Sequence, residues 1–247
     1  MRSDQLPGYD PRVPHVALLG SPSLLDHCAP EDADGLTVTR IDDASALDAP
    51  VDRPVDAIVA FDPSEADLAA LVAAGRPTIV WWQDAAPEWA ARAATAGGDL
   101  VRTVTGAAEA GPDSWRSVAL PVADRLFADL SAQAAGPDGR TAIAVNFADE
   151  SGPPTTHRAL VALAGGQLLV SERLRPSRGL EPGIDYLEIR DLQEIRSAVD
   201  NAVRAPEAFL RVRLRGRRKA ELFRSSRVVA RLVGDLLLEL DLAVSAR

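Results

Sequence analysis

Short apolar runs alternate with stretches of helical periodicity between residues 15 and 135, and this alternation most constrains the fold. Strands that are separated by helices form a parallel sheet with both faces covered. The pattern therefore predicts a Rossmann-like first lobe. The predicted strands are 15–20, 36–41, 56–61, 77–82, 100–104 and 117–120, and the predicted helices are 64–75, 87–96 and 122–135.

A Gly- and Pro-containing segment at 136–140 (GPDGR) is the best boundary in the chain, because it lies between a helix signal and a strand signal. We predict two lobes, 1–139 and 140–247. The second lobe should hold strands 141–147, 167–171 and 185–189, together with a short helix that Thr155 or Thr156 caps and whose apolar body is 159–164. Terminal helices are expected at 192–203, with Asp191 as the cap, and at 206–223 and 225–242.

Composition sets limits on the class of protein. The 247 residues are 47% apolar and 26% charged, which is typical of a globular chain. The net charge of −9 disfavours binding to nucleic acid. No apolar run approaches the roughly 20 residues of a membrane span, and the N-terminal residues lack the apolar stretch of a signal peptide. We therefore expect a cytoplasmic protein without a membrane span.

Several catalytic classes lack their motifs. The turn after the first strand reads Gly20-Ser21-Pro22-Ser23 instead of a dinucleotide-binding Gly-x-Gly-x-x-Gly. The three histidines are scattered, so no metal site is predicted. Cys28, the single cysteine, excludes an internal disulfide; we expect it in a loop of acidic residues that raises the pKa of its thiol.

The most informative stretch runs from residue 146 to residue 186. It contains a strand, a polar loop, a helix start at Thr-His-Arg, a Gly-Gly stop, a second strand and a Gly-rich loop. Loops at the carboxyl ends of parallel strands bind ligands, so Arg158 and the amides of residues 177–179 could contact a diphosphate. Alternatively, Arg158 is a solvated surface residue and the glycines only turn the chain.

The chain from residue 142 onward resembles the C-terminal part of the CgeB-like (spore-maturation type) glycosyltransferases, which have the two-Rossmann GT-B fold. The residues that follow the order of that family are Arg158, Ala162, Leu163, Ala164, Gly166, Ser171, Glu172, Gly179, Glu181, Gly183, Asp191 and Leu192. The resemblance implies transfer of a sugar from a nucleotide-sugar donor, as co-substrate, to an unidentified acceptor. It implies no other cofactor and no metal.

The resemblance also implies roles for individual residues. Arg158 and the Gly179 loop would stabilise the diphosphate leaving group. Glu181 or Glu172 would contact hydroxyls of the ribose or the donor sugar, and Ser171 belongs to the same donor-binding set. In the resembling fold the last helix crosses back onto the first lobe. The side chains expected to make that contact are Leu232, Leu236, Leu237, Leu240 and Leu242.

Two residues are weak candidates for the catalytic base. Asp84 follows a predicted strand on the acceptor side, although a lone carboxylate there is more often a helix cap or loop acid. His157 could serve as a base or bind phosphate, or it is a surface histidine. Trp81 and Trp82 end the same strand as Asp84, and we favour packing for both over contact with the cleft.

Two departures from the family open a second hypothesis: its donor-binding acidic residues are not in place, and the second lobe is abridged relative to that of the family. Val161 stands where the family has a Glu that is expected to hold the ribose. A non-catalytic relative that binds a nucleotide or a partner protein is therefore the alternative function, and a homo-oligomer is left open. We expect Val161 to pack in a closed contact between helix and sheet.

The Arg-rich segment 204–231 carries nine Arg and one Lys against two acidic residues. We favour a solvated helix face here over a surface that binds an anionic partner. The side chains predicted to face inward are Phe209, Val212, Ala220 and Phe223, and those predicted to face outward are Arg211, Arg215, Arg218 and Lys219.

Overall fold

Six parallel strands form the sheet of the first lobe, in the order β2-β1-β3-β4-β5-β6. The computed structural model describes residues 13–31, 35–48, 54–83, 87–107, 114–127, 129, 142–147 and 156–245. The strands are β1 (His15–Leu19), β2 (Thr37–Ile41), β3 (Ala57–Phe61), β4 (Thr78–Trp82), β5 (Val101–Thr105) and β6 (Arg116–Ser117). The sequence alternation therefore predicted this sheet correctly, with the last strand ending at Ser117 and not at Leu120.

Side chains alternate between the two faces of this sheet, and different segments cover each face. One face packs against the 3-10 turn Ala44–Asp48 and the helices α2 (Glu65–Ala73) and α3 (Glu88–Gly97). The predicted cap of α2 is confirmed, because Ser64 and Asp67 form a reciprocal capping box.

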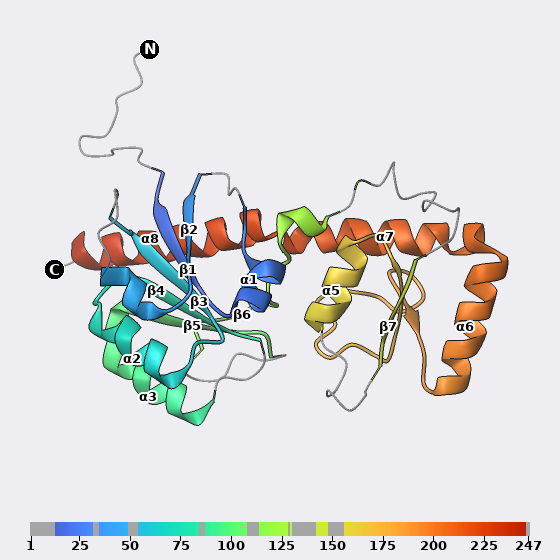
Figure 1. Ribbon diagram of the computed structural model, residues 1–247, viewed down its shortest axis with the longest axis horizontal. Coiled ribbons are helices and arrows are strands. Elements are labelled where there is room, and N and C mark those ends of the chain that lie inside the picture. Colours follow the sequence, from blue (N-terminus) through green and yellow to red (C-terminus); the bar gives the residue numbers. More distant parts are fainter. Residues whose placement is uncertain are drawn as a thin grey trace, which may run out of the picture.

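The opposite face of the sheet packs against α1 (Pro22–Cys28) and α8 (Ser225–Ser245), the last helix of the chain. The buried sheet side chains in this cluster are Val16, Leu18, Ala57, Val59, Phe61, Ile79, Trp81 and Val104, and α8 contributes Val228, Val229, Leu232, Val233 and Leu236. Figure 1 shows α8 running along the first lobe. The predicted return of the last helix is thus confirmed, except that Leu242 is 61% exposed.

The second lobe has a three-stranded parallel sheet in the order β7-β8-β9 within the described residues. These strands are β7 (Ile143–Asn146), β8 (Leu168–Ser171) and β9 (Leu187–Glu188). The helices α5 (Thr156–Ala164), α6 (Leu192–Arg204) and α7 (Leu210–Ala220) complete the lobe. Gly216 of α7 lies so close to the loop before β9 that a Cβ there would approach the carbonyl oxygen of Asp185 to 2.3 Å.

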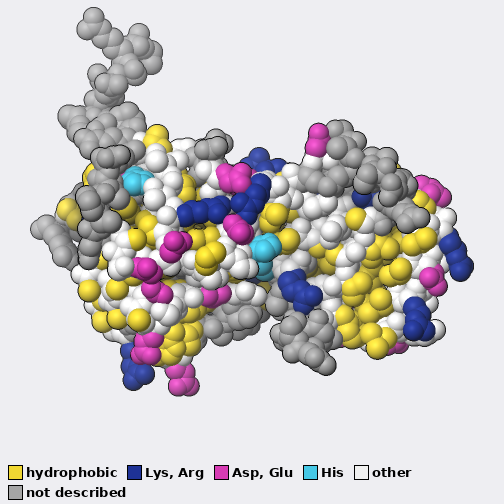
Figure 2. All heavy atoms as spheres, in the orientation of Figure 1, with side chains coloured by type: hydrophobic (Ala, Val, Ile, Leu, Met, Phe, Trp, Pro, Cys, Tyr) yellow, Lys and Arg dark blue, Asp and Glu magenta, His cyan; other side chains and the backbone are white. Residues whose placement is uncertain are grey.

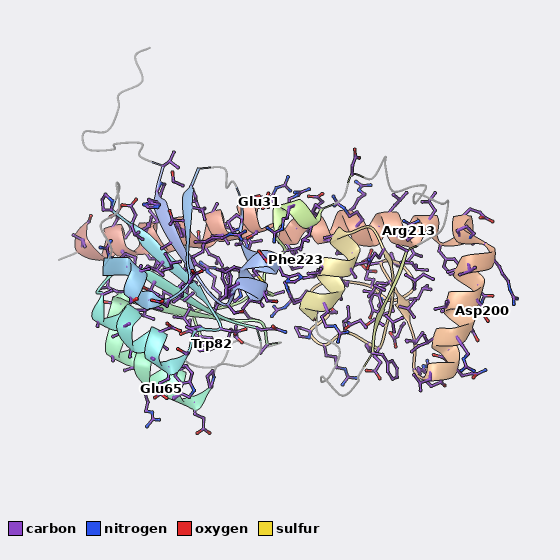
Figure 3. The ribbon with its side chains drawn as sticks, viewed as in Figure 1. Glu31, Glu65, Trp82, Asp200, Arg213 and Phe223 are labelled. Carbon is purple, nitrogen blue, oxygen red and sulfur yellow. The ribbon has the colours of Figure 1, made fainter. Side chains whose placement is uncertain are left out.

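Two segments cross side by side between the lobes. Val122 donates its amide to the Phe223 carbonyl at 2.8 Å, and Ser225 donates its amide to the Val122 carbonyl at 2.9 Å. Figure 3 shows Phe223 at this junction, with Arg213 of α7 in the second lobe. The helix predicted from residue 122 is therefore wrong at its start, because this backbone pairs with the other crossing segment. Residues 124–126 then form a 3-10 turn.

Three further expectations need correction or fall outside the described residues. Residues 22–28 form α1, with Ser21 as its cap, so Cys28 ends a helix and does not lie in a loop. The segment predicted as one helix from Pro206 to Phe223 is α7 flanked by two 3-10 turns. The predicted boundary at 136–140 lies outside the described residues.

The Arg-rich helix is only partly a solvated face. Arg211, Arg215 and Arg218 are exposed, as predicted. Arg213 and Arg217, however, are only 8% and 4% exposed. The Arg213 Nε donates to the carbonyl of Gly166 at 3.0 Å, so this arginine ties α7 to the end of α5.

No helix in the part of the chain that the structure describes is long and apolar enough to span a membrane.

Removing a buried α8 side chain should destabilise the first lobe. Leu232 is 1% exposed in the cluster against the sheet, and Leu232→Ala should lower the free energy of unfolding by about 2–5 kcal/mol. Leu238 is 60% exposed on the same helix, so Leu238→Ala should change it by less than about 0.5 kcal/mol. Urea unfolding of both variants measures the difference; equal effects would contradict the role assigned to α8.

Candidate functional site

A cavity of about 770 Å³ lies between the two lobes. The first lobe contributes the start of α1 and the carboxyl ends of β3 and β4, whereas the second contributes β7, α5 and their neighbours. Polar lining residues of the first lobe include Ser21, Ser23, His27, Asp62 and Gln83; the second lobe includes Asn146, His157, Arg158 and Gln167. Figure 2 shows the surface narrowing between the lobes, where histidine and basic side chains appear.

The position of this cavity follows from the parallel sheets. Strand ends of an open parallel sheet leave crevices at their carboxyl edge, where ligands bind. β1, β3 and β4 end beside one another, and their following residues form the first wall. The volume lies within the roughly 300–1,000 Å³ of small-molecule sites. The cavity is therefore the candidate functional site.

Arg158 is exposed and lines the cavity from the first turn of α5. The amides at the start of a helix and its dipole favour an anion there. Thr156 connects the start of α5 to the loop that follows β8, because its hydroxyl donates to the Pro176 carbonyl at 2.7 Å. Arg158 therefore lies in the cavity wall, and its role in binding a diphosphate stays a prediction.

His157 also lines the cavity, but it belongs to the contact between the lobes. Its Nε2 lies 3.7 Å from the Sγ of Cys28 at the end of α1. Burial lowers the pKa of His157 to about 4, so the imidazole is neutral at neutral pH. The roles of His157 as a base and in binding phosphate stay predictions.

Cys28 is buried, in contrast to the expected loop position. Burial is the main reason that the pKa of its thiol is raised, and the negative charge of Asp62 adds to it. The predicted direction is confirmed, but the acidic residues beside Cys28 in sequence are not the cause. A buried protonated thiol is chemically inert.

Ser171 and Glu172 lie at the carboxyl end of β8, outside the residues that line the cavity. Ser171 is fully buried; its Oγ donates to the carbonyls of Asn146 and Glu172 at 3.0 and 2.7 Å and accepts from Asn146 Nδ2 at 3.1 Å. Ser171 therefore positions Asn146, which does line the cavity.

Gly179 and Glu181 likewise lie outside the cavity lining. Gly179 has a φ of +81°, which requires glycine-like freedom, and it packs beside Lys219. Glu181 is exposed, with its Oε1 4.0 Å from the Lys219 Nζ. The proposed roles of both residues in donor binding stay predictions.

Arg178, which sequence reasoning did not single out as a functional residue, connects this loop to the first lobe. Its Nη1 donates to the Ser117 carbonyl at 3.0 Å, and its Nη2 donates to the carbonyls of Gly106 and Ala107 at 2.9 and 2.6 Å. Nη2 also lies 2.9 Å from the Ser117 hydroxyl. Burial lowers the pKa of this guanidinium, which nevertheless stays charged.

The Arg178 contact reaches the cavity wall through the backbone. Gly106 donates its amide to the Trp82 carbonyl at 2.8 Å, and a Cβ on Gly106 would lie 1.9 Å from the Gln83 carbonyl oxygen. The backbone N–H of Gln83 in turn donates to Asp62 Oδ1 at 2.9 Å. The loop of the second lobe thus supports the first-lobe wall.

The other sequence candidates have different outcomes. Asp84 lies outside the described residues. Trp81 and Trp82 are 0% and 5% exposed, so the packing interpretation is confirmed. Trp82 makes an edge-on contact with Trp89.

Val161 does not have the closed environment that we expected. It is half-buried and lines the cavity, so a larger or charged side chain there would face the open volume. Asp62 and Gln83 were missed entirely, because each is one polar residue after an apolar strand. A signal was present, because neighbouring parallel strands end at the same edge of a sheet, so that the residues directly after β3 and β4 are expected to lie close together.

No group of three or more His, Cys, Asp or Glu side chains suited to a metal ion occurs within the described ranges.

Loss of the Arg178 guanidinium should loosen the contact between the lobes. Arg178→Ala removes three bonds from a charged donor to backbone carbonyls and should lower the free energy of unfolding by about 1.5–3 kcal/mol. Arg175 is exposed in the same loop, and Arg175→Ala should change it by less than about 0.5 kcal/mol. Chemical denaturation measures both; an unaffected Arg178→Ala would contradict the bridging role.

Comparison with known proteins supports the fold. No family model and no curated protein sequence matches this chain. The structure is similar to the crystal structure of Anabaena Alr3699/HepE in complex with UDP, with a TM-score of 0.53 and 10% identity over 92% of this chain and 100% of that one. AviGT4, a glycosyltransferase involved in avilamycin A biosynthesis, is 17% identical over 84% of this chain and 59% of that one. Its TM-score of 0.26 is too low to support an argument. The chain therefore has the two-lobed, parallel α/β architecture of the GT-B type.

Proposed function

We propose that this protein is a glycosyltransferase of the CgeB-like type, which transfers a sugar from a UDP-sugar to an acceptor hydroxyl. The observation that carries the proposal is the cavity between the two parallel sheets, with Arg158 and the start of α5 in its wall. The similarity to Alr3699/HepE, a structure determined with UDP, supports the choice of nucleotide.

In this proposal the second lobe binds the donor. Transfer of the sugar leaves negative charge on the nucleoside diphosphate, and groups aimed at that charge lower the barrier. Arg158 would pair with the diphosphate oxygens, and the first amides of α5 would face the same group. No metal and no cofactor other than the donor co-substrate is part of the proposal.

The position of Val161 bears on how tightly the nucleotide binds. The resemblance expects a glutamate that holds the ribose at this place, and Val161 faces the cavity without a hydrogen-bonding group. We infer that the donor binds without this contact and depends more heavily on the diphosphate. The alternative of a non-catalytic relative rests on this substitution and on the abridged second lobe.

Calorimetric titration with UDP, CDP, GDP and ADP tests the proposed site. UDP should bind in the micromolar range, and Arg158→Ala should weaken it by about 10–100-fold because a charge-assisted bond is lost. Arg211 is an exposed arginine of α7 outside the cavity lining, and Arg211→Ala should leave the affinity unchanged. Absence of binding by all four nucleotides, or equal loss in both variants, would contradict the proposal.

Restoring the family's acidic residue should strengthen UDP binding. In Val161→Glu the new carboxylate would face a ribose hydroxyl, and a hydrogen bond to a charged group contributes about 1.5–3 kcal/mol, which is roughly a tenfold or larger gain in affinity. Val161→Gln is the control: glutamine has the size of glutamate but no charge, so this variant should gain less affinity for UDP. Calorimetry and melting curves measure both; a lower melting temperature without tighter binding would mean that Val161 is sealed from the nucleotide.

A further inference from the structure

Asp62 has an unusual backbone conformation at the mouth of the cavity. It directly follows β3 and has a φ of +45°, a region that non-glycine residues rarely adopt. Among the described residues only Arg178 shares this feature without being glycine. Such strain persists where the surrounding structure imposes it, and it concentrates at functional sites. Asp62 lines the cavity between the lobes, and Arg178 makes the hydrogen bonds from the second lobe that support the wall of this cavity.

The neighbouring strand holds the Asp62 carboxylate in place. The Asp62 amide donates to the Trp81 carbonyl at 2.9 Å, which continues the ladder between β3 and β4. Oδ1 accepts from the Gln83 amide at 2.9 Å. The side chain is exposed and lines the cavity. A fixed carboxylate therefore faces the volume that Arg158 borders from the second lobe.

The rest of the first-lobe wall favours a neutral, hydroxylated molecule. Ser21, Ser23 and Gln83 offer hydroxyl and amide groups, and the His27 Nδ1 donates to the Ser23 carbonyl at 2.8 Å. No Lys or Arg of the described first-lobe residues lines the cavity. An anionic acceptor would meet the negative charge of Asp62 on this wall, whereas sugar hydroxyls can pair with each of these groups.

We propose that Asp62 binds the acceptor hydroxyl and takes its proton during sugar transfer, an inference that rests on the proposed glycosyltransferase function. The acceptor oxygen forms a bond to the anomeric carbon of the donor sugar. The bond from that carbon to the diphosphate oxygen breaks, and its electron pair leaves with UDP. The hydroxyl proton moves to the Asp62 carboxylate, so charge and atoms balance.

His157, the other titratable group considered for this step, is poorly suited to it. Its Nε2 faces the Cys28 sulfur and its ring is held in the contact between the lobes. Burial disfavours the imidazolium that would form if it accepted a proton. Asp62 instead faces the open cavity, where an acceptor has access to it.

Asp62→Asn separates the proton-accepting role from the structural one. Asparagine tolerates positive φ, and its carbonyl oxygen can still accept from the Gln83 amide. The assay measures UDP release from UDP-glucose, UDP-galactose and UDP-N-acetylglucosamine, with water or methyl glucoside as acceptor. We expect UDP release to fall by about 100-fold or more, while UDP affinity in calorimetry changes less than about twofold because Arg158 is intact.

Two further variants make the result specific. Asp42 is an exposed carboxylate just after β2, at the same sheet edge but outside the cavity, and Asp42→Asn should keep the wild-type rate. Asp62→Gly suits the positive φ, and added formate should restore part of its lost rate by replacing the carboxylate.

The outcomes distinguish this inference from the proposed function. If the wild type releases UDP and Asp62→Asn does so at the same rate, the role of Asp62 is overturned and the glycosyltransferase function stands. If formate does not restore Asp62→Gly, the slow rate reflects the lost Gln83 contact and the role is again overturned. If the wild type binds no UDP and cleaves no donor, the proposed function fails and this inference fails with it.

Discussion

The packing of the C-terminal helix on the first lobe is the constraint on which the rest of the structure depends. One face of the six-stranded sheet would expose apolar side chains to water unless α8 covered it together with α1. The chain must therefore leave the first lobe after β6, build the second lobe, and return. This return requires two crossings, and their pairing at Val122 and Arg224 places both at one junction.

The junction is held by charged groups that compensate one another. Glu221 accepts from Arg224 and Arg217, and these two arginines hold the pKa of Glu221 down to about 2. Both guanidinium groups also lie over the Phe127 ring, that of Arg217 at 4.7 Å and that of Arg224 at 4.1 Å from its centroid. Arg178 makes a second connection between the lobes, through its hydrogen bonds to the carbonyls of Gly106, Ala107 and Ser117. With contacts at two places, the carboxyl edges of the two sheets face a common cavity.

The candidate site could be predicted only in part. Arg158 was identified from its place at the start of a helix after a strand, which is a local signal, and it does line the cavity. Asp62 and Gln83 have no such signal, because their proximity comes from the order of β3 and β4 in the sheet. Ser171, which was expected in the donor-binding set, is buried and bonds to Asn146, so its role toward the donor stays a prediction. Arg178 has no local signal either, because the carbonyls that it contacts belong to Gly106 and Ala107 of the first lobe, about 70 residues earlier in the chain.

The sequence by itself determined the elements whose causes are local: the short apolar strands, the Ser64 cap of α2 and the Gly-Gly stop of α5. The helix predicted from residue 122 is not formed at its start, because the backbone there pairs with residues about one hundred positions later in the chain. Sequence reasoning also missed that Arg213 and Arg217 are buried, because the Gly166 carbonyl that Arg213 contacts and the Phe127 ring that covers Arg217 are distant in sequence. Local propensity fixes strands and caps, whereas the tertiary structure alone decided which strand ends share a cavity and which arginines leave the solvent, since those energies arise from contacts between residues distant in sequence.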